Sequence, residues 1–351
     1  MISEYKKGRG SQLNPNNKFL PKTIVIDHIE GIDQGININH SRKVFVDSPN
    51  AIISENKSPD IPFRYSINPY QGCEHGCVYC YSRPTHNYWG FSAGMDWENK
   101  IIVKKNAAYL LEKTFLKNNW EPETIMLSGN TDPYQPLEQR LKITRALLKL
   151  FVKYHNPVGI ITKNSLISRD IDLLKYLANR NLTRVFFSIT TMDEKLRRKL
   201  EPRTSNATKL LKTIELLSSS GIEVGVMMGP IIPSINDHEI EHILKAASDH
   251  GAITANFTFA RFNGDVSEIF EDWLMKNFPD RASKVWNKVK SLHGGKVNDS
   301  RFYKRMGGEG NYAQIIKSFF NASKKKYFTQ KEMKPLRKDL FRKKGNLNLF
   351  H

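Results

Sequence analysis

Short apolar runs alternate with helical stretches along the chain from Ser66 onward. The first run ends near Tyr70, and five more follow at residues 124–127, 158–162, 184–190, 223–228 and 253–259. The segments between them place apolar residues every three or four positions, as helices do. The expected helices cover residues 103–117, 137–154, a stretch capped by Asp170 towards 179, a stretch broken at Pro202 that ends at 220, and 236–250. This alternation is typical of a parallel α/β sheet.

Six such units fit into about 195 residues, which is too few for a closed barrel of eight strands. The sequence therefore predicts an α/β fold of the open, partial (β/α)6 TIM-like type. In barrels of this kind the functional site lies at the carboxyl ends of the strands. Side chains that directly follow the six runs are accordingly the first candidates for function.

The flanks of this core have a different composition. Residues 1–60 are rich in Asn, Lys, Gly and Pro and predict an irregular arm, with strand-like runs at 22–27 and around 43–47. After a core over 61–260, residues 261–351 predict a helical extension with helices at 266–277, 281–293 and 311–323. Its tail, 324–344, is a basic arm that carries ten Lys or Arg against Glu332 and Asp339.

The chain is strongly basic, with 54 Lys and Arg against 35 Asp and Glu and a formal charge of +19. Such a charge attracts polyanions, which makes DNA or RNA the first candidate partner, although excess lysine can also simply solvate a surface. No apolar run approaches the roughly 20 residues that span a bilayer, and the first residues lack the apolar stretch of a signal peptide. We therefore expect a cytoplasmic protein without a membrane partner.

All three cysteines of the chain lie within eight residues, as Cys73, Cys77 and Cys80. So few cysteines do not make a disulfide framework, and the C-x3-C-x2-C spacing on a glycine-rich loop after a strand suits an iron–sulfur cluster. A [4Fe–4S] cubane held by three thiolates leaves one iron open to a ligand from outside the protein. Gly72 and Gly76 would let the loop curl so that the thiolates converge.

Two other interpretations of the cysteines stay open at this point. One is a tetrahedral zinc site in which His75 or His86 supplies the fourth ligand, although structural zinc sites usually contain two close cysteine pairs. The other is three reduced cysteines without a metal. A zinc-stabilised module that binds nucleic acid would follow from the first of these.

The cysteine spacing after the first strand of a partial barrel resembles the radical S-adenosylmethionine (SAM) superfamily. More narrowly, the chain is similar to the spore photoproduct lyase-related group often called DNA repair photolyases. The matching stretches are GRGSQLNP, INPYQGCEHGCVYCYSRPTH, SGNTDPYQPLE, TKNSLISRDIDLL, EPRT and GGKVNDSRFYKRMGG. The resemblance implies a [4Fe–4S] cluster on the three cysteines, reductive cleavage of SAM to a 5′-deoxyadenosyl radical, and an electron donor such as flavodoxin or ferredoxin.

The resemblance also assigns residues to the cofactor. Lys163 and Ser188, at the ends of the third and fourth strands, match SAM-contacting residues of photoproduct lyase, and the loop after the second strand would receive the SAM amine. The candidates there are Ser128, Asn130, Thr131 and Asp132. Taken without the resemblance, Lys163 is a solvated lysine, Ser188 a small sheet residue and the N-T-D-P segment a turn. Three further positions are weaker candidates for contacts with SAM: Glu201, Arg203 and Gly229.

Tyr79 and Tyr81 flank the last cysteine as tyrosines of the hydrogen-transfer relay do in photoproduct lyase, so we predict them as catalytic residues. That lyase uses a further cysteine after its second strand as hydrogen donor, where this chain has SGNTD. The reaction is therefore unassigned. The substrate is a nucleic acid in the first hypothesis, and a protein, peptide or small metabolite in the second.

Overall fold

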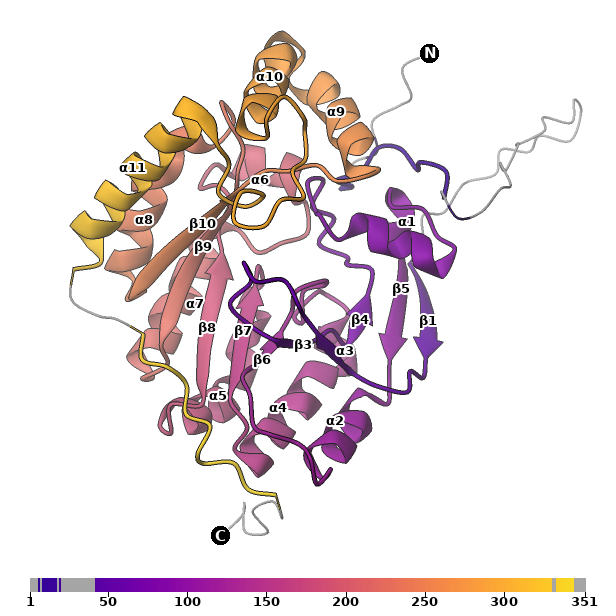
Figure 1. The fold of residues 1–351 in the computed structure, drawn as a ribbon, viewed down its shortest axis with the longest axis vertical. Coiled ribbons are helices and arrows are strands. Elements are labelled where there is room, and N and C mark those ends of the chain that lie inside the picture. The colour runs from indigo at the N-terminus through magenta and orange to yellow at the C-terminus, as the bar shows by residue number, and fades with distance from the viewer. Residues whose placement is uncertain (1–5, 7, 18, 20–41, 330–332, 344–351) are drawn as a thin grey trace, which may run out of the picture.

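The computed structural model describes residues 6, 8–17, 19, 42–329 and 333–343. A seven-stranded sheet forms its centre, in the order β10-β9-β8-β7-β6-β3-β2 (Figure 1). The first six of these pair in parallel and β2 (Ile53–Glu55) is antiparallel to β3. The parallel strands are β3 (Tyr65–Ile67), β6 (Ile125–Leu127), β7 (Val158–Thr162), β8 (Thr183–Ser188), β9 (Val224–Ile231) and β10 (Thr254–Phe259). The six predicted strands and the open α/β architecture are confirmed, since in the described residues the sheet ends at β10 and β2 without closing.

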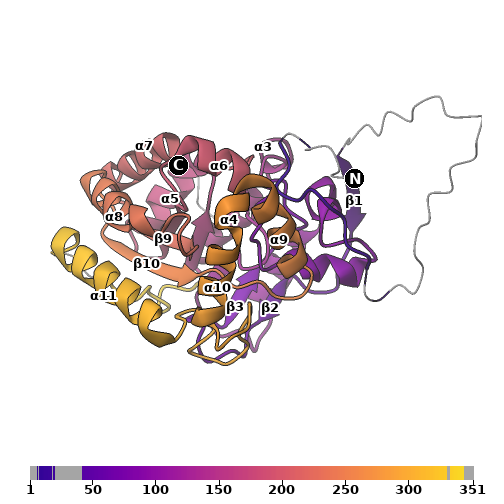
Figure 2. The same cartoon turned by 90° about the horizontal axis from the view of Figure 1, so that it is seen from above.

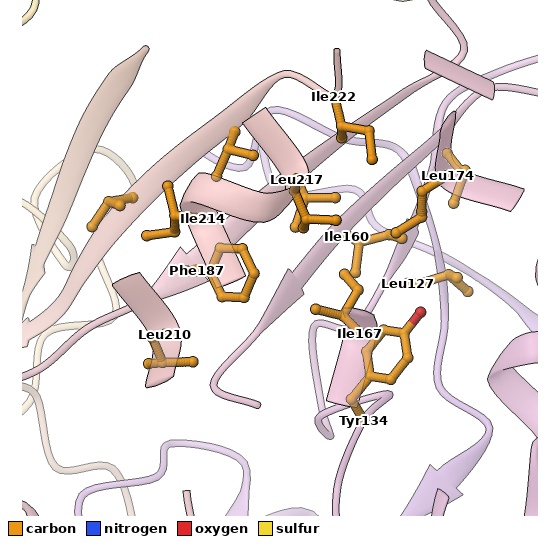
Figure 3. Packing of buried hydrophobic residues seen from close by; sticks show 14 of the residues in the cluster. Leu127, Tyr134, Ile160, Ile167, Leu174, Phe187, Leu210, Ile214, Leu217 and Ile222 are labelled. Atoms are coloured by element: carbon orange, nitrogen blue, oxygen red, sulfur yellow. The ribbon is translucent and has the colours of Figure 1, made fainter. Parts of the chain in front are cut away.

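Helices cover the sheet because each carries one apolar face. In α7, Leu210, Ile214 and Leu217 are buried and lie near Phe187 of β8 (Figure 3). Removing such a face from water stabilises the fold by about 25 cal/mol per Å² of apolar surface. The helices of the core are α2 (Ala107–Phe115), α3 (Glu138–Leu141), α4 (Ile143–Tyr154), α5 (Ile171–Ala178), α6 (Glu194–Leu200), α7 (Ala207–Ser219) and α8 (Ile240–Asp249).

A second sheet of three strands, in the order β1-β5-β4, stands beside the first and contains β1 (Lys43–Asp47), β5 (Lys100–Lys104) and β4 (Tyr70–Gln71). In the view from above, β1 lies at one side of the molecule and α11 at the other (Figure 2). The predicted run around 43–47 is confirmed as β1, whereas the run at 22–27 falls outside the described residues. The predicted helix 103–117 is wrong at its start. The β-branched residues of β5 are buried as a strand, and α2 begins only at residue 107.

Two details of the predicted helices also differ. Lys142 adopts a left-handed backbone with φ of 54°, so the predicted helix 137–154 is divided into α3 and α4. Asp170 precedes α5 but its carboxylate makes no capping bond there. It instead pairs with Arg145 at 2.9 Å and with Arg169 at 2.7 Å. Asn164 caps the short 3-10 helix η2 (Ser165–Asp170), which precedes α5.

The carboxyl-terminal extension forms the three predicted helices, α9 (Val266–Asn277), α10 (Ala282–Leu292) and α11 (Gly310–Tyr327). α9 and α10 lie above the strand ends in Figure 1. Phe262 stacks on Phe270 there at 4.0 Å between ring centroids, in an apolar cluster that also contains Cys77 and Tyr79. The extension thereby forms one wall of the cysteine loop.

The tail returns along the opposite end of the sheet. In residues 333–343, the Arg337 amide donates to Asn181 O and the Arg342 amide to Tyr154 O, both at 2.9 Å. These acceptors lie just before β8 and β7 begin, so this part of the basic arm runs at the amino ends of the strands (Figure 1). Its cations therefore lie at the end of the sheet remote from the cysteines. No helix in the described part of the chain is long and apolar enough to cross a membrane.

Candidate active site

The cysteine loop follows β3 and β4 and curls in two successive turns. The Gly76 amide donates to Cys73 O at 3.4 Å and the Cys80 amide to Cys77 O at 3.3 Å. Gly72 and Gly76 have φ of 79° and 70°, and a Cβ on Gly72 would lie 2.9 Å from the carbonyl oxygen of Lys100. The loop therefore requires glycine at these two positions, as its sequence suggested.

The chemistry of the three thiols fits a cluster. All three are free, Cys73 and Cys77 are buried and Cys80 is half-buried. Burial raises the pKa of each thiol, so a bound metal is what would release the protons and leave the thiolates that iron requires. In the described residues no three His, Cys, Asp or Glu side chains lie close enough to share one ion. A cubane is larger than an ion and takes its thiolates at wider spacing, and three free thiols on one loop are the ligand type that it requires.

The two histidines considered as zinc ligands have other partners. His75 Nδ1 lies 3.4 Å from Asp132 Oδ2, and its Nε2 lies 3.3 Å from Asn164 Nδ2. His86 packs against the rings of Phe91 and Trp97, with centroids 5.2 and 5.4 Å away. His75 is thus engaged by polar contacts, whereas His86 is held by ring packing and its two buried ring nitrogens have no hydrogen-bond partner among the described residues. A Cys3His centre draws no support, because no such group of ligands lies close together there.

Acid is expected to destabilise the fold through His86. Burial lowers the pKa of this imidazole from 6.5 to about 4, so the folded protein favours the neutral ring. The contribution is complete above pH 6.5 and is lost as the pH falls towards 4, where protonation favours the unfolded chain. At about 1.4 kcal/mol per pKa unit the loss amounts to about 3 kcal/mol. Urea unfolding at pH 7 and pH 4 measures it, and His86→Phe should weaken this pH dependence. Equal pH dependence in both proteins would contradict the assignment to His86.

A polar network lies beside Cys77, centred on the carboxylate of Glu201. Glu201 Oε2 accepts a hydrogen bond from the Tyr79 hydroxyl, lies 3.0 Å from Lys163 Nζ and 3.2 Å from Thr190 Oγ1, and is 4.0 Å from Cys77 Sγ. Burial and the charge of Cys77 and Glu201 raise the pKa of Tyr79 far above its usual value. The network therefore holds one cation, one carboxylate and a protonated phenol against the cysteine loop.

The carbonyl of Gly229 completes this network from β9. It accepts hydrogen bonds from Lys163 Nζ at 3.3 Å, Ser188 Oγ at 3.2 Å and Thr190 Oγ1 at 3.2 Å. Residues at the ends of β7 and β8 thus converge on the Gly229 carbonyl oxygen of β9. The structure therefore brings the predicted residues Lys163, Ser188 and Tyr79 close together. Thr190 was not among the predicted residues, although it is the last residue of the predicted fourth strand and the strand-end rule pointed to it.

The loop after β6 approaches the same place but is held by internal bonds. Asp132 Oδ1 accepts from Thr162 Oγ1 at 2.7 Å, and its Oδ2 accepts from the Lys163 amide at 2.7 Å. Ser128 Oγ donates to Thr131 O at 3.3 Å. Asp132 therefore fixes the loop against β7, and Ser128 bonds within the loop. Contact of either residue with SAM stays a prediction.

The two predicted catalytic tyrosines occupy different environments. Tyr79 is buried, whereas Tyr81 is 49% exposed and its hydroxyl donates to Gly129 O in the loop after β6. The guanidinium of Arg261 lies 5.7 Å from the Tyr81 ring centroid. Of the two tyrosines, Tyr81 is therefore the one that is accessible from solvent.

A strap from the amino-terminal arm covers the back of the cysteine loop. The amides of Gly10 and Ser11 donate to the carboxylate of Glu98 at 3.3 and 2.9 Å, and Arg83 pairs with Glu98 at 2.6 Å while donating to Cys77 O at 2.8 Å. A Cβ on Gly10 would lie only 1.6 Å from the carbonyl oxygen of Gly76. The GRGSQLNP segment is thus built into the wall of the site, a role that its sequence did not reveal.

An open parallel α/β sheet with three cysteines on the loop after its first parallel strand defines an enzyme that uses radical chemistry on SAM. The family model of the radical SAM superfamily matches residues 67–247, and the chain belongs to this superfamily. An uncharacterized protein of Mycobacterium tuberculosis is 31% identical over 234 residues, which cover 65% of this chain and 69% of the relative.

Two further relatives extend the comparison. An uncharacterized protein of Methanocaldococcus jannaschii is 28% identical over 226 residues, covering 64% of this chain and 81% of that protein. A radical SAM Nα-GlyT isomerase of Pseudomonas phage M6 is 26% identical over 226 residues, covering 63% of this chain and 44% of the isomerase. Among solved structures, spore photoproduct lyase complexed with a dinucleoside spore photoproduct matches 86% of each chain with a TM-score of 0.59 at 16% identity. This last likeness confirms the fold.

Proposed function

We propose that this enzyme holds a [4Fe–4S] cluster on Cys73, Cys77 and Cys80, binds SAM beside it and acts on a nucleic acid at the carboxyl ends of the strands. The observation that carries the proposal is that Cys77, one of three cysteines on a single loop, lies 4.0 Å from Glu201, which pairs with Lys163 at 3.0 Å. A cluster with an open iron supplies the electron that cleaves SAM into methionine and a 5′-deoxyadenosyl radical.

The residues of the network suit the two ends of SAM. The Lys163 ammonium can meet a carboxylate, and the Ser188 hydroxyl can bond a sugar. Since Tyr79 is buried and protonated, it positions Glu201 and keeps water from the thiols. Asp132 holds the backbone of Lys163 in place, which would orient that ammonium towards the cofactor.

Exposed aromatic rings with arginines beside them support a nucleic acid as the substrate class. Tyr81, Phe302 and Tyr303 are 49%, 50% and 71% exposed. Arg261 lies over Tyr81 at 5.7 Å, and burial, followed by the charge of Arg305, lowers the pKa of Arg261. Arg305 lies over Phe302 at 5.1 Å and pairs with Asp60 at 2.6 Å. Flat rings stack on bases and arginines attract phosphates, which is how single strands are bound. The solved lyase of similar fold carries a dinucleoside, and we extend that ligand class to this chain.

Release of 5′-deoxyadenosine tests the proposal. Anaerobically reconstituted protein with dithionite and SAM should form it, and single-stranded DNA or RNA should raise the rate with a steep decline as salt increases. The double variant Phe302→Ala/Tyr303→Ala should weaken oligonucleotide binding, measured by fluorescence anisotropy, by about 5- to 150-fold, the loss of one stacked base.

Tyr109→Ala is the matched control, because Tyr109 is 65% exposed but lies on α2. It should bind oligonucleotides as the unaltered protein does. Oligonucleotides that neither bind nor stimulate a protein able to cleave SAM would redirect the search to a protein or small-metabolite substrate.

A further inference from the structure

We propose that the groove beside α6 is the docking site for an acidic one-electron carrier protein of the flavodoxin or ferredoxin class. The groove has a volume of about 640 Å³, and cationic side chains of α6 form much of its lining, namely Lys195, Arg197, Arg198 and Lys199. Pro202 forms part of its wall. This inference rests on the proposed function, since the partner serves the cluster.

The charge of the groove is unbalanced. Arg197 and Arg198 share the single carboxylate of Glu194, each at 2.7 Å, and the Arg198 side chain is 73% exposed. Lys195 is exposed and Lys199 half-buried. Four cations against one carboxylate in seven residues form a positive surface to which an acidic protein is steered by charge.

Only one layer of residues separates this surface from the cysteines. The Val78 amide donates to Leu200 O, the last residue of α6, at 2.9 Å. The next residue, Glu201, lies 4.0 Å from Cys77 Sγ, and a Cβ on Gly76 would lie 3.4 Å from Pro202 Cγ. Electron transfer between proteins slows steeply with the distance between redox groups. A carrier seated in the α6 groove would therefore be separated from the cysteine loop by the residues that end α6.

The chemistry requires such a partner. Cleavage of one SAM consumes one electron, breaks the bond between the sulfonium sulfur and C5′, and leaves methionine and the 5′-deoxyadenosyl radical. The carrier protein is oxidised by that one electron. Because the proposed substrate contacts are Tyr81, Arg261 and the segment around Phe302 while the groove is formed by α6, substrate and carrier would bind to different elements.

The test compares two reductants and adds a binding measurement. The triple variant Lys195→Gln/Arg198→Gln/Lys199→Gln should bind oxidised flavodoxin about tenfold more weakly at low salt, measured by calorimetry. Its flavodoxin-driven formation of 5′-deoxyadenosine, with the NADPH-dependent reductase present, should fall by a similar factor in kcat/KM. Its dithionite-driven rate should be retained, because dithionite is small and needs no docking surface. Arg197 is left in place since it donates to Glu201 O and Thr204 O.

The matched control removes the same charge elsewhere. Lys113, Lys149 and Lys175 are exposed on α2, α4 and α5, and their triple change to Gln should leave flavodoxin binding unaltered. Equal weakening in both variants, unchanged flavodoxin binding in the α6 variant, or loss of oligonucleotide binding alone would overturn the docking site. A further outcome separates this inference from the proposed function. If flavodoxin binding depends on α6 but neither the unaltered protein nor the variants cleave SAM with dithionite, the proposed function is wrong and the docking site is supported.

Discussion

Cys77→Ala is expected to reduce the formation of 5′-deoxyadenosine at least about a thousandfold, which corresponds to about 4 kcal/mol in the barrier. Cys77 is buried, and its sulfur lies 4.0 Å from Glu201 Oε2. With two thiolates the cluster loses a ligand, and the brown colour and iron content of the reconstituted protein should fall with the activity. Chromatography of the nucleoside and iron analysis measure the two effects.

Thr213→Ala provides the control, because Thr213 is equally buried but lies on α7, where its hydroxyl donates to the carbonyl of Lys209. It should keep both iron and activity. A colourless Cys77→Ala protein alone does not separate iron from zinc, so the unaltered protein must also be analysed. Zinc in place of iron in anaerobically prepared protein, with no nucleoside formed, would contradict a catalytic cluster.

Much of the fold and of this site can be predicted from short segments of the sequence. The β-branched runs predict six strands whose order along the chain is also their order across the sheet, because each helix returns the chain to the neighbouring position. The strand-end rule then brings Lys163 and Ser188 to one edge, and the cysteine spacing with Gly72 and Gly76 predicts a curled loop. In each case one short segment carries the whole signal.

Contacts between distant segments could not be predicted. Glu98 joins Gly10, Arg83 and Arg203, which are far apart in the chain, and no periodicity relates them. The sequence predicts a helix that begins inside β5, because the partners of this strand, β1 and β4, are short strands from other parts of the chain. Likewise, the basic composition of the tail did not reveal that it binds the end of the sheet remote from the site.

Those distant contacts explain how the loop is enclosed. The strap around Gly10 closes its back, the apolar cluster of α9 and α10 forms one wall, and the Glu201 network lies against Cys77. The buried carboxylates of this enclosure are tolerated because they are paired, Glu98 with Arg83 and Glu201 with Lys163. Removing one member of a pair should therefore affect both the fold and the cluster.

Glu98→Ala is expected to lower the free energy of unfolding by about 3–5 kcal/mol, the usual cost of leaving one partner of a buried ion pair uncompensated. The side chains of Glu98 and Arg83 are both fully buried, 2.6 Å apart. The carboxylate also accepts the amides of Gly10 and Ser11, so the strap should detach from the loop. Urea unfolding measures the loss of stability, and the iron retained after reconstitution should fall because Arg83 no longer fixes Cys77 O.

The double variant Glu98→Ala/Arg83→Met separates charge from packing. If the stranded guanidinium causes most of the loss, removing it as well should cost less than the sum of the two single changes. Asp249→Ala is the exposed control, since its pair with Lys245 lies on the surface of α8 and surface pairs contribute little. If the Glu98→Ala protein is as stable and binds as much iron as the unaltered protein, the contact between the strap and the loop contributes neither to stability nor to cluster binding. If stability falls but the iron content does not, the Glu98–Arg83 pair stabilises the fold only. The conformation of the cysteine loop would then depend on the hydrogen bonds of its own turns.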